Sequence, residues 1–264
     1  MKKVFILIVL FYAAACSVTK NNSSTMRFAN NPVIAHRGAY RQNGFPENSI
    51  ASLQQAMKLK CAGSEFDVWM TADDSLVIHH DPAYNNLAIE KTVFEELRKY
   101  PLSDNEPLPL LREYLLAGKK NNTETRLILE IKPSRISKER GKLVAEKVIT
   151  LVHQLNCSNW MVYISFDYDI LKRIHQLEPN AVTQYLNGDM APSVLKADGI
   201  SGLDYHYAVF KKNPGWIQEA KNNKLQLNAW TVDDSTDMRW LLDNRFDFIT
   251  TNQPELLFNI LKTR

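Results

Sequence analysis

Residues 33–68, VIAHRGAYRQNGFPENSIASLQQAMKLKCAGSEFDV, contain the pattern that decides the fold. The apolar run Val33–His36 predicts a strand, the periodic stretch Ser49–Leu59 predicts a helix, and Ser64–Val68 predicts a second strand. A strand, a helix and a strand in this order indicate two parallel strands that are joined by a right-handed crossover.

The same alternation continues along the rest of the chain. Further short apolar runs predict strands at Leu127–Ile131, Val162–Ser165, Val182–Leu186, Gly199–Leu203, Gln226–Trp230 and Asp247–Thr251. Helical patterns separate these runs at Leu108–Leu116, Lys138–Leu155, Tyr168–Leu177, Met190–Leu195, Trp216–Asn222 and Met238–Asn244. Eight strands that alternate with helices predict an α/β protein with a TIM (β/α)8 barrel. A doubly wound open sheet is the alternative, but no glycine-rich dinucleotide fingerprint follows the first strand.

One segment after the second strand interrupts the alternation. TADDS, at residues 71–75, predicts a turn between two extended stretches, and the interval is too short for a crossover helix. The second strand should therefore pass the barrel rim, turn and return as a small β-hairpin. With the turn centred between Asp73 and Asp74, Asp67 is expected to lie opposite His80.

The length and composition favour one globular domain. A chain of 264 residues fits a single α/β barrel. A net charge of +3 without a run of Lys or Arg argues against nucleic acid as a partner. Apart from Cys16, the chain has Cys61 and Cys157, which are too few for a disulfide framework and are expected to be buried thiols. A single bridge between them is the alternative.

The N-terminus has the pattern of a secretion signal with a lipid attachment site. The basic start MKK precedes the apolar run Val4–Ala15, which has the length of a signal-peptide core and is too short to span a bilayer. Small residues immediately before Cys16 resemble a bacterial lipobox, although Ala13 stands where Leu is preferred. Plain secretion with an incidental cysteine is the alternative.

The chain is therefore expected to have three parts. Residues 1–16 form a signal peptide that ends at the lipidated cysteine, residues 17–27 form a polar tether, and residues 28–264 form the barrel domain. The protein is expected to be exported and anchored to the membrane of the bacterial cell envelope by its lipid. Ser17 is not the Asp that retains lipoproteins in the inner membrane, which favours the outer membrane.

Ionisable residues gather at the predicted carboxyl ends of the strands, where TIM barrels carry their active sites. Such side chains are costly to bury unless they are paired or bind a metal, so their common position at one rim indicates a functional site. These residues are His36, Arg37, Glu65, Asp67, His80, Glu130 and Lys132.

The three carboxylates and two histidines suit metal-dependent acid/base chemistry. Glu65, Asp67 and Glu130 come from neighbouring strands, and ligation by oxygen alone suits Ca²⁺ or Mg²⁺ rather than zinc. His36 and His80 are predicted to meet at the rim, where one imidazole can accept a proton and the other can donate one.

Two cationic side chains extend this interpretation to a phosphate. Arg37 and Lys132 offer donors for phosphate oxygens, although Lys132 and Glu130 are alternatively a structural ion pair. A metal, two histidines, an arginine and a lysine together describe phosphoryl transfer at a phosphodiester. Asp233 and Asp234, after the seventh strand, are expected to cap the next helix.

Several motifs in this chain resemble the glycerophosphodiester phosphodiesterase family. HRG, PEN, ExD, HD and ExK occur in this order, and NAWTV and FITTNQP follow, so that the similarity covers about residues 33–254. The resemblance implies a metal-dependent hydrolysis of glycerophosphodiesters to glycerol 3-phosphate and an alcohol, within lipid and glycerol metabolism. It implies that His36 and His80 form the general acid/base pair and that Arg37 and Lys132 contact the phosphate. It also implies that Glu65, Asp67 and Glu130 hold the metal.

The resemblance also implies roles for two further residues. Glu47, from the PEN motif, would lie near the metal or brace Arg37. Trp230 would form a wall of the substrate pocket rather than part of the core. Of the adjacent His79 and His80, the HD pattern favours His80 as the active-site residue.

Two other functions stay open. One is a phospholipase-type phosphodiesterase that acts on phosphatidylinositol, or in the manner of sphingomyelinase D, although few apolar residues beyond Trp216 occur in the nearby loops. The other is a non-catalytic surface lipoprotein on a degenerate barrel, which the presence of every expected catalytic residue disfavours.

Overall fold

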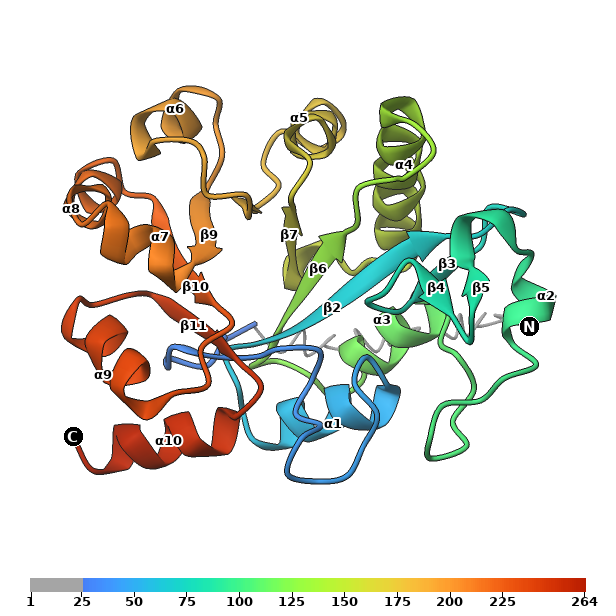
Figure 1. The fold of residues 1–264 in the computed structure, drawn as a ribbon, viewed down its shortest axis with the longest axis horizontal. Helices are drawn as coiled ribbons and strands as arrows, with labels where there is room; N and C mark the ends of the chain where they lie inside the picture. The colour runs from blue at the N-terminus through green and yellow to red at the C-terminus, as the bar shows by residue number, and fades with distance from the viewer. Residues whose placement is uncertain (1–25) are drawn as a thin grey trace, which may run out of the picture.

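A closed ring of eight parallel strands forms the centre of the protein in this computed structural model, which describes residues 26–264 (Figure 1). In ring order the strands are β1 (Val33–Ala35), β2 (Gly63–Met70), β6 (Arg126–Ile131), β7 (Met161–Ser165), β8 (Thr183–Tyr185), β9 (Gly202–His206), β10 (Gln226–Trp230) and β11 (Phe248–Thr251). Pairing of β11 with β1 closes the ring, so the predicted TIM barrel is confirmed. The predicted signal peptide, Cys16 and nearly all of the predicted tether lie outside the described residues.

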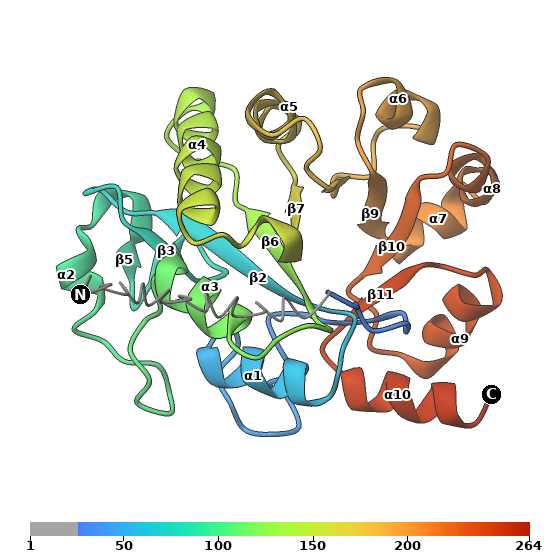
Figure 2. The same ribbon diagram turned by 180° about the vertical axis from the view of Figure 1, so that it is seen from behind.

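Helices surround the barrel on its outer side, as Figures 1 and 2 show from opposite directions. They are α1 (Ile50–Lys58), α3 (Leu111–Lys119), α4 (Lys138–Gln154), α5 (Tyr168–Leu177), α6 (Pro192–Ala197), α7 (Tyr207–Lys212), α8 (Gly215–Asn222), α9 (Ser235–Asp243) and α10 (Pro254–Lys262). Each buries an apolar face against the strands; α5, for example, buries Ile170, Leu171 and Ile174. None of the helices within residues 26–264 is both long and apolar enough to cross a bilayer.

The predicted hairpin after the second strand is present and leads into a small excursion beside the barrel (Figure 1). Its elements are β3 (Leu76–Ile78), β4 (Ala83–Tyr84), β5 (Leu87–Ala88), the 3₁₀ turn η1 (Ile89–Lys91) and α2 (Phe94–Leu97). A separate apolar cluster that includes Trp69, Val77 and Leu97 holds the excursion together. This arrangement fixes the end of β3, from which one active-site histidine extends.

The predicted register of this hairpin is wrong by one residue. Extension of the observed ladder places Asp67 opposite His79 rather than His80, and the His79 amide donates to the Asp67 carbonyl at 3.1 Å. The turn contains a three-residue loop that ends in Asp74, which adopts a left-handed conformation with φ 64°. Such a loop shifts the pairing relative to the two-residue turn that the prediction assumed.

The sixth strand was also predicted too early in the chain. The prediction was Gly199–Leu203, whereas β9 begins at Gly202 and ends at His206. Gly199 has φ 79° and donates to the carbonyl of Lys196, so it belongs to the turn that ends α6. The shift brings a further carboxylate, discussed below, into the barrel wall.

The two remaining cysteines are free and buried, as expected. Cys61 and Cys157 have fully buried side chains and form no disulfide within the described residues. Both pack within the main apolar core between the barrel and its helices. Their role is therefore packing, and burial raises the pKa of the Cys61 thiol, which keeps it unreactive.

Candidate active site

A cavity lies at the carboxyl ends of the barrel strands. About 450 Å³ of space lies between its walls and at its open mouth. The residues predicted from the sequence that line it are His36, Arg37, Glu65, His80, Glu130, Lys132 and Trp230. The remaining two, Glu47 and Asp67, contact the guanidinium group of Arg37 beside the cavity.

The HRG sequence forms a tight turn that directs two side chains into this cavity. Arg37 and Gly38 both have left-handed backbones, with φ of 53° and 80°. A Cβ atom on Gly38 would lie 2.3 Å from Ser52 Oγ, so both the backbone angle and the close approach require glycine there. The turn aims the Arg37 amide at Glu65, whose Oε2 accepts its hydrogen bond at 2.9 Å.

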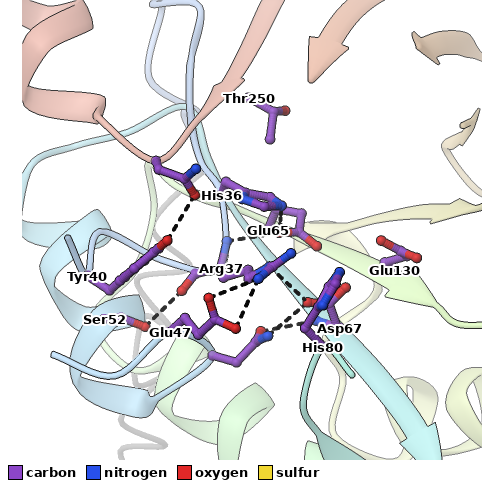
Figure 3. Close-up of polar contacts among 12 residues, drawn as sticks. His36, Arg37, Tyr40, Glu47, Ser52, Glu65, Asp67, His80, Glu130 and Thr250 are labelled. Carbon is purple, nitrogen blue, oxygen red and sulfur yellow. Dashed lines mark hydrogen bonds and ion pairs between the residues drawn. The ribbon is translucent and has the colours of Figure 1, made fainter. Parts of the chain in front are cut away.

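Hydrogen bonds fix the tautomer of His36. Figure 3 shows its ring beside Glu65. The Asn252 amide nitrogen donates to Asp233 at 2.8 Å, which turns the amide oxygen of Asn252 toward His36 Nδ1, 2.7 Å away. An amide oxygen only accepts, so Nδ1 carries the proton and donates it. His36 Nε2 is then left with its lone pair, and it lies 3.8 Å from Glu65 Oε2.

The surroundings of His36 keep its ring neutral. Burial lowers the pKa of His36 to about 4, and the adjacent positive charge of Arg37 acts in the same direction. The imidazole is therefore uncharged at neutral pH and can accept a proton at Nε2.

Glu47 braces Arg37. The resemblance implied either this role or a position near the metal. Both carboxylate oxygens of Glu47 accept from Arg37 NH1, at 2.9 and 3.0 Å. Arg37 Nε lies 3.8 Å from Asp67 Oδ2. The guanidinium group is thus held at the cavity wall, in the position where it can contact a bound anion.

The three predicted carboxylates form a compact cluster. Glu65 and Asp67 lie on β2 and Glu130 on β6, where Asp67 and Glu130 are register partners. Each can offer one oxygen such that all three oxygens lie within 4.8 Å of one another. Glu65 Oε1 is buried and has no hydrogen-bond partner within the described part of the chain. Oxygen donors in this arrangement fit a hard divalent cation.

Crowding of negative charge shifts the protonation of this cluster. Burial, with Asp67 next in effect, raises the pKa of Glu130 to about 8 and that of Glu65 well above its usual range. Burial has the same tendency at Asp67, but Lys132 and other nearby positive charges such as Arg37 together outweigh it and lower the pKa of Asp67. A bound cation would relieve this repulsion, so the electrostatics also fit a metal site.

Lys132 lies beside two of the carboxylates. Its Nζ is 2.7 Å from Asp67 Oδ1 and 2.8 Å from Glu130 Oε1, in a nearly buried position. These contacts are short ion pairs. The ammonium group lines the cavity, so it is placed both to pair with the acids and to face an anionic ligand.

His80 enters the cavity from the end of the hairpin, whereas His79 does not. Trp69 Nε1 donates to the His80 carbonyl at 3.1 Å, and His80 Nδ1 lies 2.8 Å from the Asp81 carboxylate. His79 points the other way and packs edge-on against Tyr84. The imidazole of His80 is about one third exposed, whereas that of His36 is 16% exposed.

Trp230 forms part of the cavity wall, as the resemblance implied. Its indole nitrogen donates to the Asp204 carbonyl at 2.8 Å, and Phe166 packs edge-on against its ring at 5.4 Å between centroids. His206 packs against Trp230 on another side and is not among the residues that line the cavity. The far side of the site is thus largely aromatic and apolar.

Sequence analysis missed several residues that support the site. Asn48 holds Asp67 through two hydrogen bonds, at 2.8 and 3.2 Å, and Asn252 holds His36. Asp234 does cap α9, but Asp233 instead anchors Asn252. Asn48 and Asn252 occur within the motifs PEN and TNQP, so their place in these motifs was an available signal.

Comparisons with known proteins agree with this geometry. A family model described as the glycerophosphoryl diester phosphodiesterase family matches residues 36–256. A glycerophosphodiester phosphodiesterase from Caldanaerobacter subterraneus is 27% identical over 250 residues, which cover 87% of this chain and 97% of the relative.

Solved structures show the same similarity. A glycerophosphodiester phosphodiesterase from Parabacteroides distasonis has a TM-score of 0.86 and 39% identity, and covers 90% of this chain and 99% of its own. An Oleispira antarctica phosphodiesterase, solved with the product sn-glycerol-3-phosphate, has a TM-score of 0.73 and 22% identity, with coverage of 88% and 97%. The second similarity concerns the fold alone.

Proposed function

The chain belongs to the glycerophosphoryl diester phosphodiesterase family and is a glycerophosphodiester phosphodiesterase, and from this premise we propose that it releases glycerol 3-phosphate and an alcohol by metal-dependent, two-histidine catalysis. The observation that supports the mechanism is that His36, His80, Glu65 and Glu130 line one cavity. Asp67, the third carboxylate of the cluster, lies beside it. The name of the product-bound relative supports glycerol 3-phosphate as the product.

Glu65, Asp67 and Glu130 would hold the cation. The oxygen donor set and the unpartnered Glu65 Oε1 support Ca²⁺ or Mg²⁺ equally. When bound, the cation supplies positive charge that stabilises the phosphate oxygens. Arg37, held by Glu47, would add a fixed positive charge at the same phosphate, and Lys132 would do so from the other edge of the cluster.

His36 acts as the general base in this mechanism. Its Nε2 carries the free lone pair, because Nδ1 donates to Asn252. It would accept the proton of the attacking hydroxyl, which comes either from water or from the glycerol moiety of the substrate. Burial of the ring keeps it neutral before the reaction.

His80 acts as the general acid. Its Nδ1 lies 2.8 Å from the Asp81 carboxylate, which orients the ring, and the hydrogen bond from His80 lowers the pKa of Asp81. His80 would donate a proton to the departing alcohol oxygen, whose head group leaves through the open side of the cavity. Because about one third of the His80 side chain is exposed, this proton can exchange with solvent.

Asn252 is expected to act as a positioning residue for His36. Replacement of Asn252 with Leu should lower kcat roughly 10- to 100-fold, because the ring loses the partner that fixes its tautomer. KM should change little, since Asn252 is not among the cavity-lining residues. Steady-state kinetics, with the ¹⁵N chemical shifts of the His36 ring as a second readout, test this effect.

Asn43→Leu is the matched control for this variant. Asn43 is exposed and donates to Glu255 outside the cavity, so its replacement should leave kcat and the His36 ring shifts unchanged. Unchanged ring shifts in Asn252→Leu would show that Asn252 does not set the tautomer.

The substrate class is tested on a panel of diesters. Purified protein is assayed with glycerophosphocholine, glycerophosphoethanolamine and glycerophosphoglycerol, and in parallel with phosphatidylinositol and sphingomyelin in micelles. The expected result is glycerol 3-phosphate release from the first group only. Cleavage of the lipids alone would favour the phospholipase-type alternative, and inactivity toward both groups would favour the non-catalytic lipoprotein.

We also propose that the enzyme is attached to the cell envelope, most simply the outer membrane, through Cys16. The basic start, the apolar run, the small residues before Cys16 and Ser17 after it support this proposal. In a bacterial host, the wild-type chain should fractionate with membranes and Cys16→Ser should not. Membrane association of Cys16→Ser equal to that of the wild type would contradict lipid anchoring.

A further inference from the structure

Asp204 is a buried carboxyl group that lines the active-site cavity and has no role in the mechanism above. It lies on β9, is 1% exposed, and borders the same space as the catalytic histidines. Its Oδ1 has no hydrogen-bond partner, and no ion pair involves its side chain within residues 26–264. A buried polar atom without a partner is destabilising, so its presence calls for a physical reason.

Unlike Asp204, the neighbouring polar side chains inside the barrel have hydrogen-bond partners. Asn228, the register partner of Asp204 on β10, donates to the side-chain oxygen of Gln184 at 3.4 Å. Thr250 donates to Asn228 Oδ1 at 3.2 Å. The barrel thus supplies partners for the polar side chains around Asp204 but leaves this carboxyl group free toward the cavity.

Asp204 also lies across the barrel from the catalytic cluster. In the closed strand order, β9 is four strands from β2 in either direction. The cavity therefore has a charged side, with the histidines, the acids and the two cationic residues. The opposite side has Asp204 among apolar neighbours, which are Ile164, Phe166, Leu186 and Trp230.

A phosphodiester that binds to the charged side must place one of its alcohol groups against this second side. The glycerol moiety is common to all glycerophosphodiesters, whereas the head group varies and needs an open exit. An apolar wall with one buried polar group suits a small alcohol, whose carbons pack and whose hydroxyl forms a hydrogen bond.

We propose that Asp204 binds a hydroxyl group of the glycerol moiety and is a specificity-determining residue. The proposal rests on the proposed function, because it deepens the substrate assignment of the same cavity. Burial, with Glu130 next in effect, also raises the pKa of Asp204 well above its usual range, and a neutral carboxyl group can both donate to and accept from a hydroxyl.

Binding of two phosphate monoesters tests the proposal directly. Sn-glycerol 3-phosphate and propyl phosphate have the same three-carbon chain, but propyl phosphate lacks both hydroxyls. Isothermal titration calorimetry of the Mg²⁺-loaded protein should show a preference of the wild type for glycerol 3-phosphate. Asp204→Leu should reduce this preference by about 10- to 100-fold, and its affinity for propyl phosphate should remain within about 3-fold of the wild type.

Two further variants keep the test decisive if Asp204→Leu does not fold. Asp204→Asn keeps the shape and should retain part of the preference, and Asp204→Ser should retain less. Asp198→Leu, which removes an exposed carboxylate that accepts from Tyr168 outside the cavity, is the control and should keep the full preference.

The possible outcomes separate this inference from the proposed function. An unchanged preference in all folded Asp204 variants would overturn it, as would a loss of affinity for both monoesters alike. A change only in the ratio of activities toward glycerophosphocholine and glycerophosphoglycerol would also overturn it, because Asp204 would then bind a cationic head group. The proposed function fails separately if the wild type hydrolyses no glycerophosphodiester, since the binding measurement needs no turnover.

Discussion

Replacement of His36 with alanine is expected to lower kcat for glycerophosphodiester hydrolysis by about 10²- to 10⁴-fold. The variant removes an imidazole at the cavity whose Nε2 keeps a free lone pair, because its Nδ1 donates to Asn252. Stability should change little, because the ring packs at the mouth of the barrel rather than in its apolar core. Steady-state kinetics on glycerophosphocholine provide the measurement.

His153→Ala is the control for this variant. His153 lies on α4, is about half exposed and pairs with Glu178 far from the cavity, so kcat should remain at the wild-type value. Addition of free imidazole to His36→Ala should restore part of the activity if the ring acts as a base. A His36→Ala enzyme with near-normal kcat would remove His36 from the mechanism.

Replacement of Glu65 with glutamine is expected to lower the catalytic activity by a similar factor. Glutamine keeps the length of the side chain but removes one of the three negative charges that would bind the cation. Loss of metal-assisted charge stabilisation, worth several kcal/mol, corresponds to a decrease in kcat/KM of roughly 10³-fold. Mg²⁺ or Ca²⁺ affinity, measured by calorimetry, should fall in parallel.

Glu124→Gln provides the matched comparison. Glu124 is an exposed carboxylate that pairs with Lys60 on the outside of the protein, so its replacement should alter neither the cation affinity nor the activity. Wild-type cation affinity in Glu65→Gln would show that the ion, if it is needed, binds elsewhere.

The barrel could be predicted from the sequence because its strands are marked in two ways. Runs such as Gln226–Trp230 are short and apolar, and the observed strand β10 has the same bounds. The ionisable residues at the strand ends then identify the functional rim, since parallel strands in a barrel all end on one side. His36, Glu65 and Glu130 meet there for this reason.

The predicted positions of strands were wrong where they depended on local backbone geometry. The register of the β2–β3 hairpin depends on whether its loop has two or three residues, and this depends on the left-handed conformation of Asp74. Gly199 fits the apolar run before β9 but ends α6 instead, so the predicted strand stopped at Leu203, one residue before Asp204. A strand that ends one residue later would have revealed the extra carboxylate.

The supporting amides were missed for a different reason. Asn48 and Asn252 are neutral, so a search for clustered charge passes over them, although they set the orientation of Asp67 and His36. Their partners are between 19 and 216 residues away in the chain, and only the closed barrel brings them together. Such hydrogen bonds depend on tertiary structure and leave little trace in local sequence patterns.

The most direct measurement of the central claim is a diesterase assay of metal-depleted protein. The purified protein is treated with EDTA, dialysed and assayed for glycerol 3-phosphate release from glycerophosphocholine before and after addition of Mg²⁺ or Ca²⁺. The three-carboxylate site predicts loss of activity on chelation and recovery with at least one of the two ions, in the wild type but not in Glu65→Gln. Full activity of the metal-depleted wild type would contradict the account.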